Sequence, residues 1–103
     1  MNTKAKGSRR EREVRDIFRK EGYHVIKAGA SLGVMDLICV WKDFSKHPIG
    51  IQVKSTRISK AERTEIEVLE IGIIKEIWIK KDRKPWIRDI WNTELKQWER
   101  NEV

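Results

Sequence analysis

The stretch IGIQVKST, residues 49–56, decides the fold, because it begins as a buried strand and then carries polar side chains among the apolar ones. Its apolar residues recur at every second position, which is the period of a β-strand. Gln52 and Lys54 are two residues apart, so their side chains leave the strand on the same face. An amide and an ammonium on one face of a buried strand indicate a task beyond packing.

A second apolar segment precedes this strand. MDLICVW at 35–41 is predicted to be a strand, and the turn-rich stretch at 41–50 separates the two, so a central β-hairpin is expected. Asp36 stands at the beginning of the first strand, where a charge is costly unless it is paired or binds a cation. The hairpin would bring Asp36 beside the face that carries Gln52 and Lys54.

Two helices are predicted from periodicity and from start and stop signals. The first covers residues 8–21 and ends at Gly22, and the second opens with a capping box at Ser59 and Glu62 and runs to about Ile71. Further strands are expected at 23–28, 75–81 and 86–91, and the last residues, 92–103, are expected to form a short helix or a flexible tail.

Length and composition indicate one small basic domain spanning residues 1–103, with residues 1–7 as a basic N-terminal arm. A net charge of +7 suits a polyanionic partner such as DNA. No apolar run approaches the roughly 20 residues that cross a bilayer, and the N-terminus lacks the apolar core of a signal peptide. We therefore expect a cytoplasmic protein without a membrane partner.

Cysteine and histidine chemistry is disfavoured. Cys39 is the single cysteine and lies in the apolar run LICVW, so a buried thiol is expected. His24 and His47 have no companion at the spacing of a metal pair, and we expect both to be structural or exposed.

The polar residues of the hairpin suit metal-assisted cleavage of phosphodiesters. Oxygens of Asp36 and Gln52 could hold a hard divalent ion, and the ammonium of Lys54 could orient or deprotonate the attacking water. Simpler interpretations stay open at this point. A lysine on an edge strand discourages aggregation, a strand glutamine can face solvent, and Asp36 can be a turn residue or the partner of a cation.

The motifs together resemble those of the PD-(D/E)XK nuclease superfamily. Asp36, followed after fifteen residues by the segment 52–54, is similar to the superfamily's motif. KGSRRER at 6–12 resembles the KGSxxER opening of archaeal Holliday junction resolvases. KAGASLGVMD at 27–36 resembles the segment before that family's motif, with Ser31 at the position of its serine.

The resemblance covers residues 6–90 and implies a fold class, an activity and partners. The fold would be α/β, a restriction-endonuclease-like core with a mixed central β-sheet flanked by α-helices. The activity would be that of a Mg²⁺- or Mn²⁺-dependent endodeoxyribonuclease, a structure-selective Holliday junction resolvase that cuts branched DNA in recombination and repair. The resemblance also implies a homodimer, and such a protein would suit an archaeal or viral genome.

Residue roles are carried over position by position. The resemblance implies that Glu11 and Asp36 are acidic site residues, that Lys54 is the catalytic lysine, and that Ser31 lies near the scissile phosphate. The expected metal ligands are Glu11, Asp36, Gln52 and the carbonyl of Val53.

Gln52 departs from the motif, which has an acid there. The glutamine removes one negative charge and keeps a carbonyl oxygen, so an ion would be held more weakly. A Gln-X-Lys motif is also similar to that of Mrr-like and virus-type replication-repair (VRR-NUC) nucleases, which act on other DNA forms. A DNA-binding module that has lost catalysis is a further alternative. A membrane-binding structural protein would need an amphipathic basic helix, which the sequence lacks.

Glu11 permits two interpretations. Ser8 and Glu11 match a capping box, in which the glutamate binds the first amide of its own helix. Glu11 is also seven residues before Phe18 and can point toward the sheet, and the family resemblance favours this second interpretation.

Two groups of cations are expected to grip the DNA backbone. The N-terminal group is Lys4, Lys6, Arg9, Arg10 and Arg12, with Arg15 beyond it. The second group is Lys80, Lys81, Arg83 and Lys84, with Trp86 as a possible stacking partner for bases.

Overall fold

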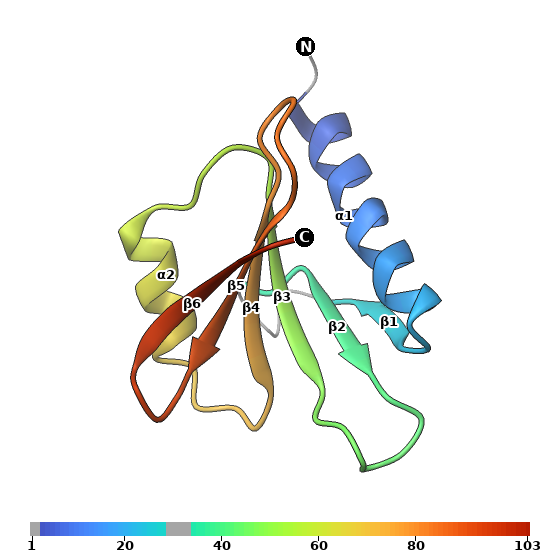
Figure 1. The fold of residues 1–103 in the computed structure, drawn as a ribbon, viewed down its shortest axis with the longest axis vertical. Coiled ribbons are helices and arrows are strands. Elements are labelled where there is room, and N and C mark those ends of the chain that lie inside the picture. The colour runs from blue at the N-terminus through green and yellow to red at the C-terminus, as the bar shows by residue number, and fades with distance from the viewer. Residues whose placement is uncertain (1–2, 29–33) are drawn as a thin grey trace.

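The computed structural model describes residues 3–28 and 34–103, with side chains from Gly7 onward. Figure 1 shows a twisted sheet with one helix on each side. In chain order the elements are α1 (Thr3–Lys20), β1 (His24–Lys27), β2 (Leu37–Val40), β3 (Ile49–Lys54), α2 (Lys60–Glu67), β4 (Ile74–Ile79), β5 (Ile87–Asn92) and β6 (Gln97–Glu102).

The six strands lie in the sheet in the order of the sequence. Neighbouring strands are antiparallel except β3 and β4, which are parallel and connected through α2. The predicted hairpin is confirmed, with Leu37 opposite Ile51. The sheet is therefore mixed and flanked by helices, as predicted, and β3 is an interior strand.

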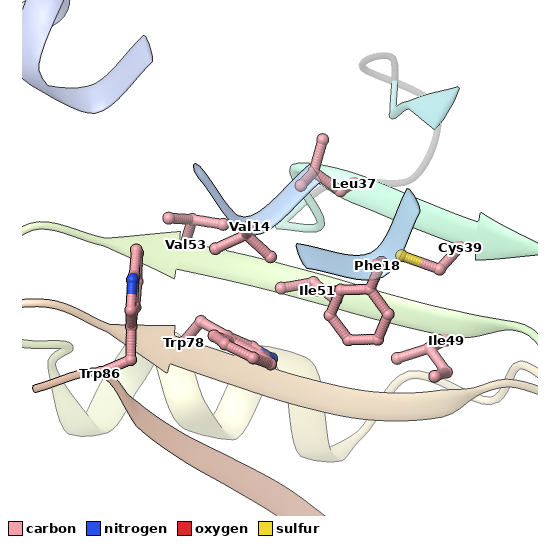
Figure 2. Packing of buried hydrophobic residues seen from close by; sticks show 9 residues of the cluster. All are labelled: Val14, Phe18, Leu37, Cys39, Ile49, Ile51, Val53, Trp78 and Trp86. Atoms are coloured by element: carbon pink, nitrogen blue, oxygen red, sulfur yellow. The ribbon is translucent and has the colours of Figure 1, made fainter. Parts of the chain in front are cut away.

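Helix α1 covers one face of the sheet. Val14 and Phe18 are buried against Ile51 and Val53 of β3 and Trp78 of β4 (Figure 2). The rings of Phe18 and Trp78 meet edge to face with centroids 5.5 Å apart. These contacts orient α1 along the sheet and fix the direction of its remaining side chains, including Glu11.

Helix α2 covers the opposite face. Its buried residue Ile66 packs with Ile77 and Ile79 of β4. In the parallel register Ile77 is opposite Gln52 and Ile79 is opposite Lys54, and paired residues share a face. Helix α2 therefore covers the face of the sheet to which the polar pair of β3 points.

The first helix begins earlier than predicted, at Thr3, so residues 3–7 are helical where an arm was expected. Ser8 is therefore inside the helix and is not its N-cap, and the capping-box interpretation of Glu11 is wrong. At the other end the predicted stop is confirmed, since Gly22 has a φ of 105° and its amide donates to the carbonyl of Arg19 at 3.0 Å.

The second helix has the predicted capping box, with Ser59 and Glu62 bonded reciprocally. It ends at Glu67, short of Ile71. The Lys75 ammonium donates to the carbonyls of Glu67 and Leu69 at 3.0 and 2.6 Å, which satisfies acceptors at the helix end.

The C-terminal segment differs from prediction, because residues 97–102 form β6 beside β5. The ring centroids of Trp91 and Trp98 lie 5.2 Å apart across this hairpin. In the turn, the side chain of Asn92 accepts from the amides of Glu94 and Leu95. Within β6 only Trp98 is half-buried, and the other residues of the strand are exposed. The strand therefore lacks the alternation of apolar and polar residues that would have predicted it.

Candidate active site

Asp36 is bound to β3 through its side chain. Its carboxylate Oδ2 accepts a hydrogen bond from the amide of Val53 at 2.8 Å, and its own amide donates to the carbonyl of Ile51 at 2.8 Å. The side chain thus extends the ladder between β2 and β3 past the beginning of β2. The structure brings Asp36 to the segment 52–54, as the hairpin predicted.

Gln52 is 9% exposed, so the interpretation as a solvent-facing glutamine is wrong. Its Oε1 is buried and has no hydrogen-bond partner among the described residues. A buried acceptor without a partner costs about 1–3 kcal/mol. An amide oxygen is a ligand for hard cations, so Gln52 fits a site that an ion would complete.

Lys54 is half-buried at the end of β3 and forms an ion pair with Glu62 of α2. The interpretation as an edge-strand lysine is wrong, because β3 pairs on both sides. The carbonyl of Lys54 accepts from the amide of Lys80 at 3.0 Å, which places the end of β4 beside this residue.

Glu11 lines a cavity of about 300 Å³ between α1 and the first two strands. Burial raises the pKa of Glu11, the negative charge of Asp36 raises it further, and Lys27 lowers it. The two carboxylates therefore share one electrostatic environment. The lining residues of the cavity are Ser8, Glu11, Arg12, Arg15, Arg19, Val25, Lys27 and Leu37.

Asp36 has a raised pKa as well. Burial is the largest cause, and the Val53 hydrogen bond together with the charges of Lys54 and Lys27 lowers the pKa only in part. Two neighbouring carboxyls with raised pKa values are typical of a functional site, and a bound cation would favour their charged forms.

Lys27 belongs to this environment and was missed by the sequence reasoning. Its charge acts on both Glu11 and Asp36. The available signal was a lysine at the end of a predicted strand, before the glycine-containing sequence 29–33, and a lysine at such a position is typical of any exposed strand end.

The donor atoms fit a hard divalent ion. Glu11 and Asp36 supply carboxylates and Gln52 an amide oxygen, and all-oxygen sets suit Mg²⁺ or Mn²⁺. Within residues 3–28 and 34–103, no three His, Cys, Asp or Glu side chains are grouped so that they could hold an ion. A metal site here would therefore depend on the amide of Gln52 and on a backbone carbonyl such as that of Val53.

The N-terminal cations divide into different environments. Arg10 is 8% exposed and pairs with Glu13 at 3.4 Å and Asp82 at 3.3 Å, so it ties α1 to the turn after β4. Arg9 and Arg12 are exposed. Lys4 and Lys6 lie in the first turns of α1, with side chains outside the described part, and Ser31 lies outside the described residues.

The second basic group lies on the turn between β4 and β5. Lys81, Arg83 and Lys84 are exposed there, and Lys80 is half-buried. Trp86 is 9% exposed and packs in the core against Trp78, with ring centroids 5.7 Å apart, so it does not offer a face to bases. The expected stacking role of Trp86 is therefore wrong.

Near this turn, a cavity of about 130 Å³ is lined by cations from four separate segments. The sequence reasoning missed it because these residues meet only in the fold. The cations are Arg57, Arg63, Lys81 and Arg100.

The sequence profile of the archaeal Holliday junction resolvase (Hjc) family matches residues 2–87. The chain belongs to this family. The predicted superfamily and fold class are thereby confirmed, and so is the predicted function of a structure-selective resolvase, a nuclease of DNA recombination and repair.

The structure of Hjc from Archaeoglobus fulgidus, a Holliday junction resolvase from an archaeal hyperthermophile, has a similar fold. The match has a TM-score of 0.62 and 21% identity, and it covers 81% of this chain and 70% of that chain. No protein with a curated description matches the sequence. No helix within the described residues is long and apolar enough to cross a membrane.

Proposed function

We propose that this resolvase is a Mg²⁺- or Mn²⁺-dependent endodeoxyribonuclease whose active site lies at the end of β3. The proposal rests on the buried Oε1 of Gln52, for which the described part of the chain offers no hydrogen-bond partner. Gln52 directly precedes Val53, whose amide binds Asp36. A buried oxygen on the strand that binds a carboxylate of raised pKa suits a cation ligand better than a packing role.

Each residue has a distinct role in this proposal. Glu11, Asp36, Gln52 and the carbonyl of Val53 would hold the ion, which when bound neutralises charge on the phosphate undergoing attack. The ammonium of Lys54 orients the attacking water toward the phosphorus. Lys27 offers a positive charge to a phosphate oxygen beside Glu11. Ser31 lies outside the described residues, and its proposed role at the scissile phosphate is carried over from the family resemblance alone.

The exposed cations of α1 and of the turn after β4 would bind the phosphates of branched DNA without reading its sequence. A homodimer would present two such sites and cut paired strands of a junction, and we propose a cytoplasmic location. Gln52 also supports a second candidate function, that of a junction-binding module that does not cleave DNA. The reason is that the Gln52 side chain lacks the negative charge of the acid usual at this position.

Thermal unfolding with Mn²⁺ tests the metal site. Mn²⁺ should raise the Tm of the wild type and leave the Tm of Asp36→Asn unchanged, because the amide keeps the Val53 hydrogen bond and loses the charge. Asp43→Asn, in the exposed loop after β2, should respond like the wild type. An equal response of Asp36→Asn would exclude Asp36 as a ligand.

Gln52→Glu tests whether the amide oxygen of Gln52 is a metal ligand. This variant restores the charge of the motif, so it should bind Mn²⁺ more tightly and cleave a junction faster than the wild type. Unchanged Mn²⁺ affinity and rate would remove Gln52 from the metal shell.

A further inference from the structure

Glu62 belongs to α2, which covers the face of the sheet opposite to α1 and Glu11. It stands one turn before Ile66, and residues four apart lie on the same face of a helix. Ile66 packs on Ile77 and Ile79, the β4 neighbours of Gln52 and Lys54. Glu62 is thereby directed to the end of β3, where its Oε2 pairs with the ammonium of Lys54.

The Glu62 carboxylate is held on two sides. Its Oε1 accepts from the amide and the hydroxyl of Ser59 at 3.2 and 3.1 Å, which leaves Oε2 for Lys54. The ion pair with Lys54 and the bonds from Ser59 lower the pKa of Glu62, so the carboxylate is charged at neutral pH.

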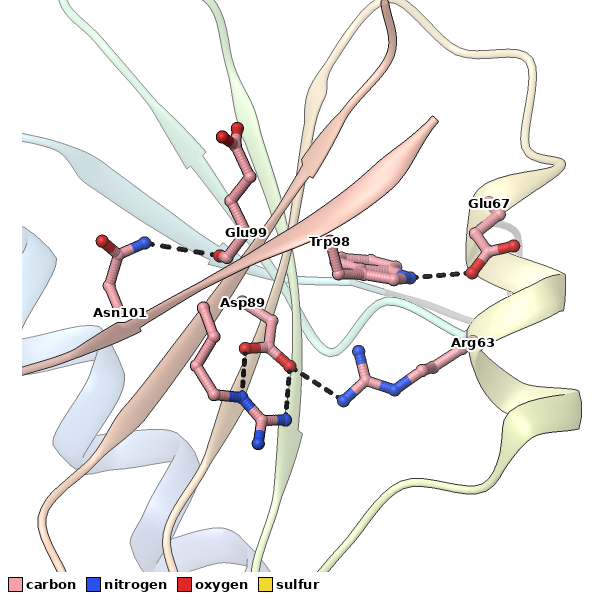
Figure 3. Close-up of polar contacts among 7 residues, drawn as sticks. Arg63, Glu67, Asp89, Trp98, Glu99 and Asn101 are labelled. Carbon is pink, nitrogen blue, oxygen red and sulfur yellow. Dashed lines mark hydrogen bonds and ion pairs between the residues drawn. The ribbon is translucent and has the colours of Figure 1, made fainter. Parts of the chain in front are cut away.

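Helix α2 itself is anchored to the sheet, so Glu62 is not carried by a free segment. Arg63 binds the buried carboxylate of Asp89 at 2.8 Å, and the indole of Trp98 donates to Glu67 at 2.7 Å (Figure 3). These contacts hold the helix against β5 and β6 and thereby limit the position of the Glu62 side chain.

We propose that Glu62 is a positioning residue for Lys54 and supplies from α2 the negative charge that Gln52 does not supply from β3. The proposal rests on the proposed function of the β3 site. In it, Glu62 holds the ammonium in one place, so that Lys54 meets the water and phosphate at the scissile bond. The alternative is that Glu62 serves only to cap α2.

Glu62→Gln separates the two roles, because glutamine at this position also forms a capping box. The variant keeps the helix start and removes the charge. If Glu62 positions Lys54, kcat on a four-way junction should fall about 10- to 100-fold with little change in KM. Glu65→Gln, an exposed residue of the same helix, is the matched control and should cleave like the wild type.

The double variant Gln52→Glu/Glu62→Gln removes the carboxylate from α2 and places one on β3, at the usual position of the motif's acid. Most of the kcat lost in Glu62→Gln should be recovered, while the cap of α2 is the same in both. A wild-type kcat in Glu62→Gln would overturn the proposal, and so would a loss that the second substitution does not restore.

Lysine labelling gives a readout that does not require cleavage. Brief acetylation of the intact protein, mapped by mass spectrometry, should modify Lys54 faster in Glu62→Gln than in the wild type, while Lys60 reacts equally in both. Equal labelling of Lys54 would overturn the proposal. If the wild type bound junctions without cutting them, the proposed function would fail, and labelling would still decide whether Glu62 holds Lys54.

Discussion

Asp89 is a charged residue at the centre of the fold, with 1% of its surface exposed. Arg100 binds both its carboxylate oxygens, at 2.9 and 3.0 Å, and Arg63 of α2 binds one of them at 2.8 Å. Burial alone would raise the pKa of Asp89, but the hydrogen bonds and charges of the two arginines outweigh it and lower that pKa. The ionised form therefore stabilises the folded state.

Asp89→Asn should lower the free energy of unfolding at neutral pH by about 3 kcal/mol, because it leaves two guanidinium groups without their shared carboxylate. The wild-type contribution is complete above the unfolded pKa of aspartate and is lost as the pH falls through the lower folded value. Urea unfolding should show the two proteins converging in acid. A difference that does not change with pH would contradict this account, and exposed Asp16→Asn is the control.

Cys39 is fully buried, and burial is the main cause that raises the pKa of its thiol to about 12. A protonated, inaccessible thiol does not react as a nucleophile. Iodoacetamide should therefore leave the native protein unmodified at pH 8 and should alkylate Cys39 in urea. Rapid alkylation without denaturant would show that the core between α1 and the sheet is open.

Single residues could be predicted from sequence where a polar side chain interrupts an apolar strand. Gln52 and Lys54 stood out for that reason, and Asp36 because it begins such a strand. Lys27 and Glu62 could not be found in this way, because their links to the site are made across the fold. Ser8 was misassigned because a serine three residues before a glutamate occurs both at helix starts and inside helices.

At the scale of elements, two glycines of the α1 region differ in what the backbone requires of them. Gly7 adopts a helical conformation that any residue can adopt, whereas Gly22, just after the helix, has a positive φ that favours glycine. Gly7 lies within the helix, and an added Cβ would meet nothing within 4 Å. Gly22 has positive φ, and an added Cβ would lie 3.0 Å from the ring of Trp41.

Gly7→Ala should raise the free energy of unfolding by about 0.5–1 kcal/mol, because alanine loses less backbone entropy in a helix. Gly22→Ala should lower it by about 1–2 kcal/mol, because alanine is strained in the left-handed region. Chemical denaturation of both variants measures the difference. A stabilising Gly22→Ala would contradict the described helix end.

Elements with strong periodicity were predicted near their true bounds, as β3, β4 and the C-terminal end of α1 show. The last strand was not, because β6 is an edge strand with one half-buried side chain, and pairing with β5 rather than its own pattern determines it. The end of α2 depends on Lys75 from a later strand, which local signals do not reveal.

For the molecule as a whole, a charge of +7 and the exposed cations of α1 and of the turn after β4 predict salt-dependent binding to DNA. Replacing Lys81, Arg83 and Lys84 by alanine should weaken junction binding equally for different sequences. It should also reduce the slope of log affinity against log salt by up to about 0.9 per lost phosphate contact. Fluorescence anisotropy in EDTA measures both effects, and an unchanged slope would remove this turn from the DNA surface.

Cleavage of a labelled four-way junction in Mg²⁺, Mn²⁺ or EDTA, by the wild type and by Asp36→Asn, tests the β3 active site most directly. Matched duplex, flap and single strands serve as comparison substrates. We expect metal-dependent nicks near the branch point by the wild type, and binding without nicks by Asp36→Asn. Cleavage by the wild type in EDTA, or equal cleavage by Asp36→Asn, would contradict this expectation.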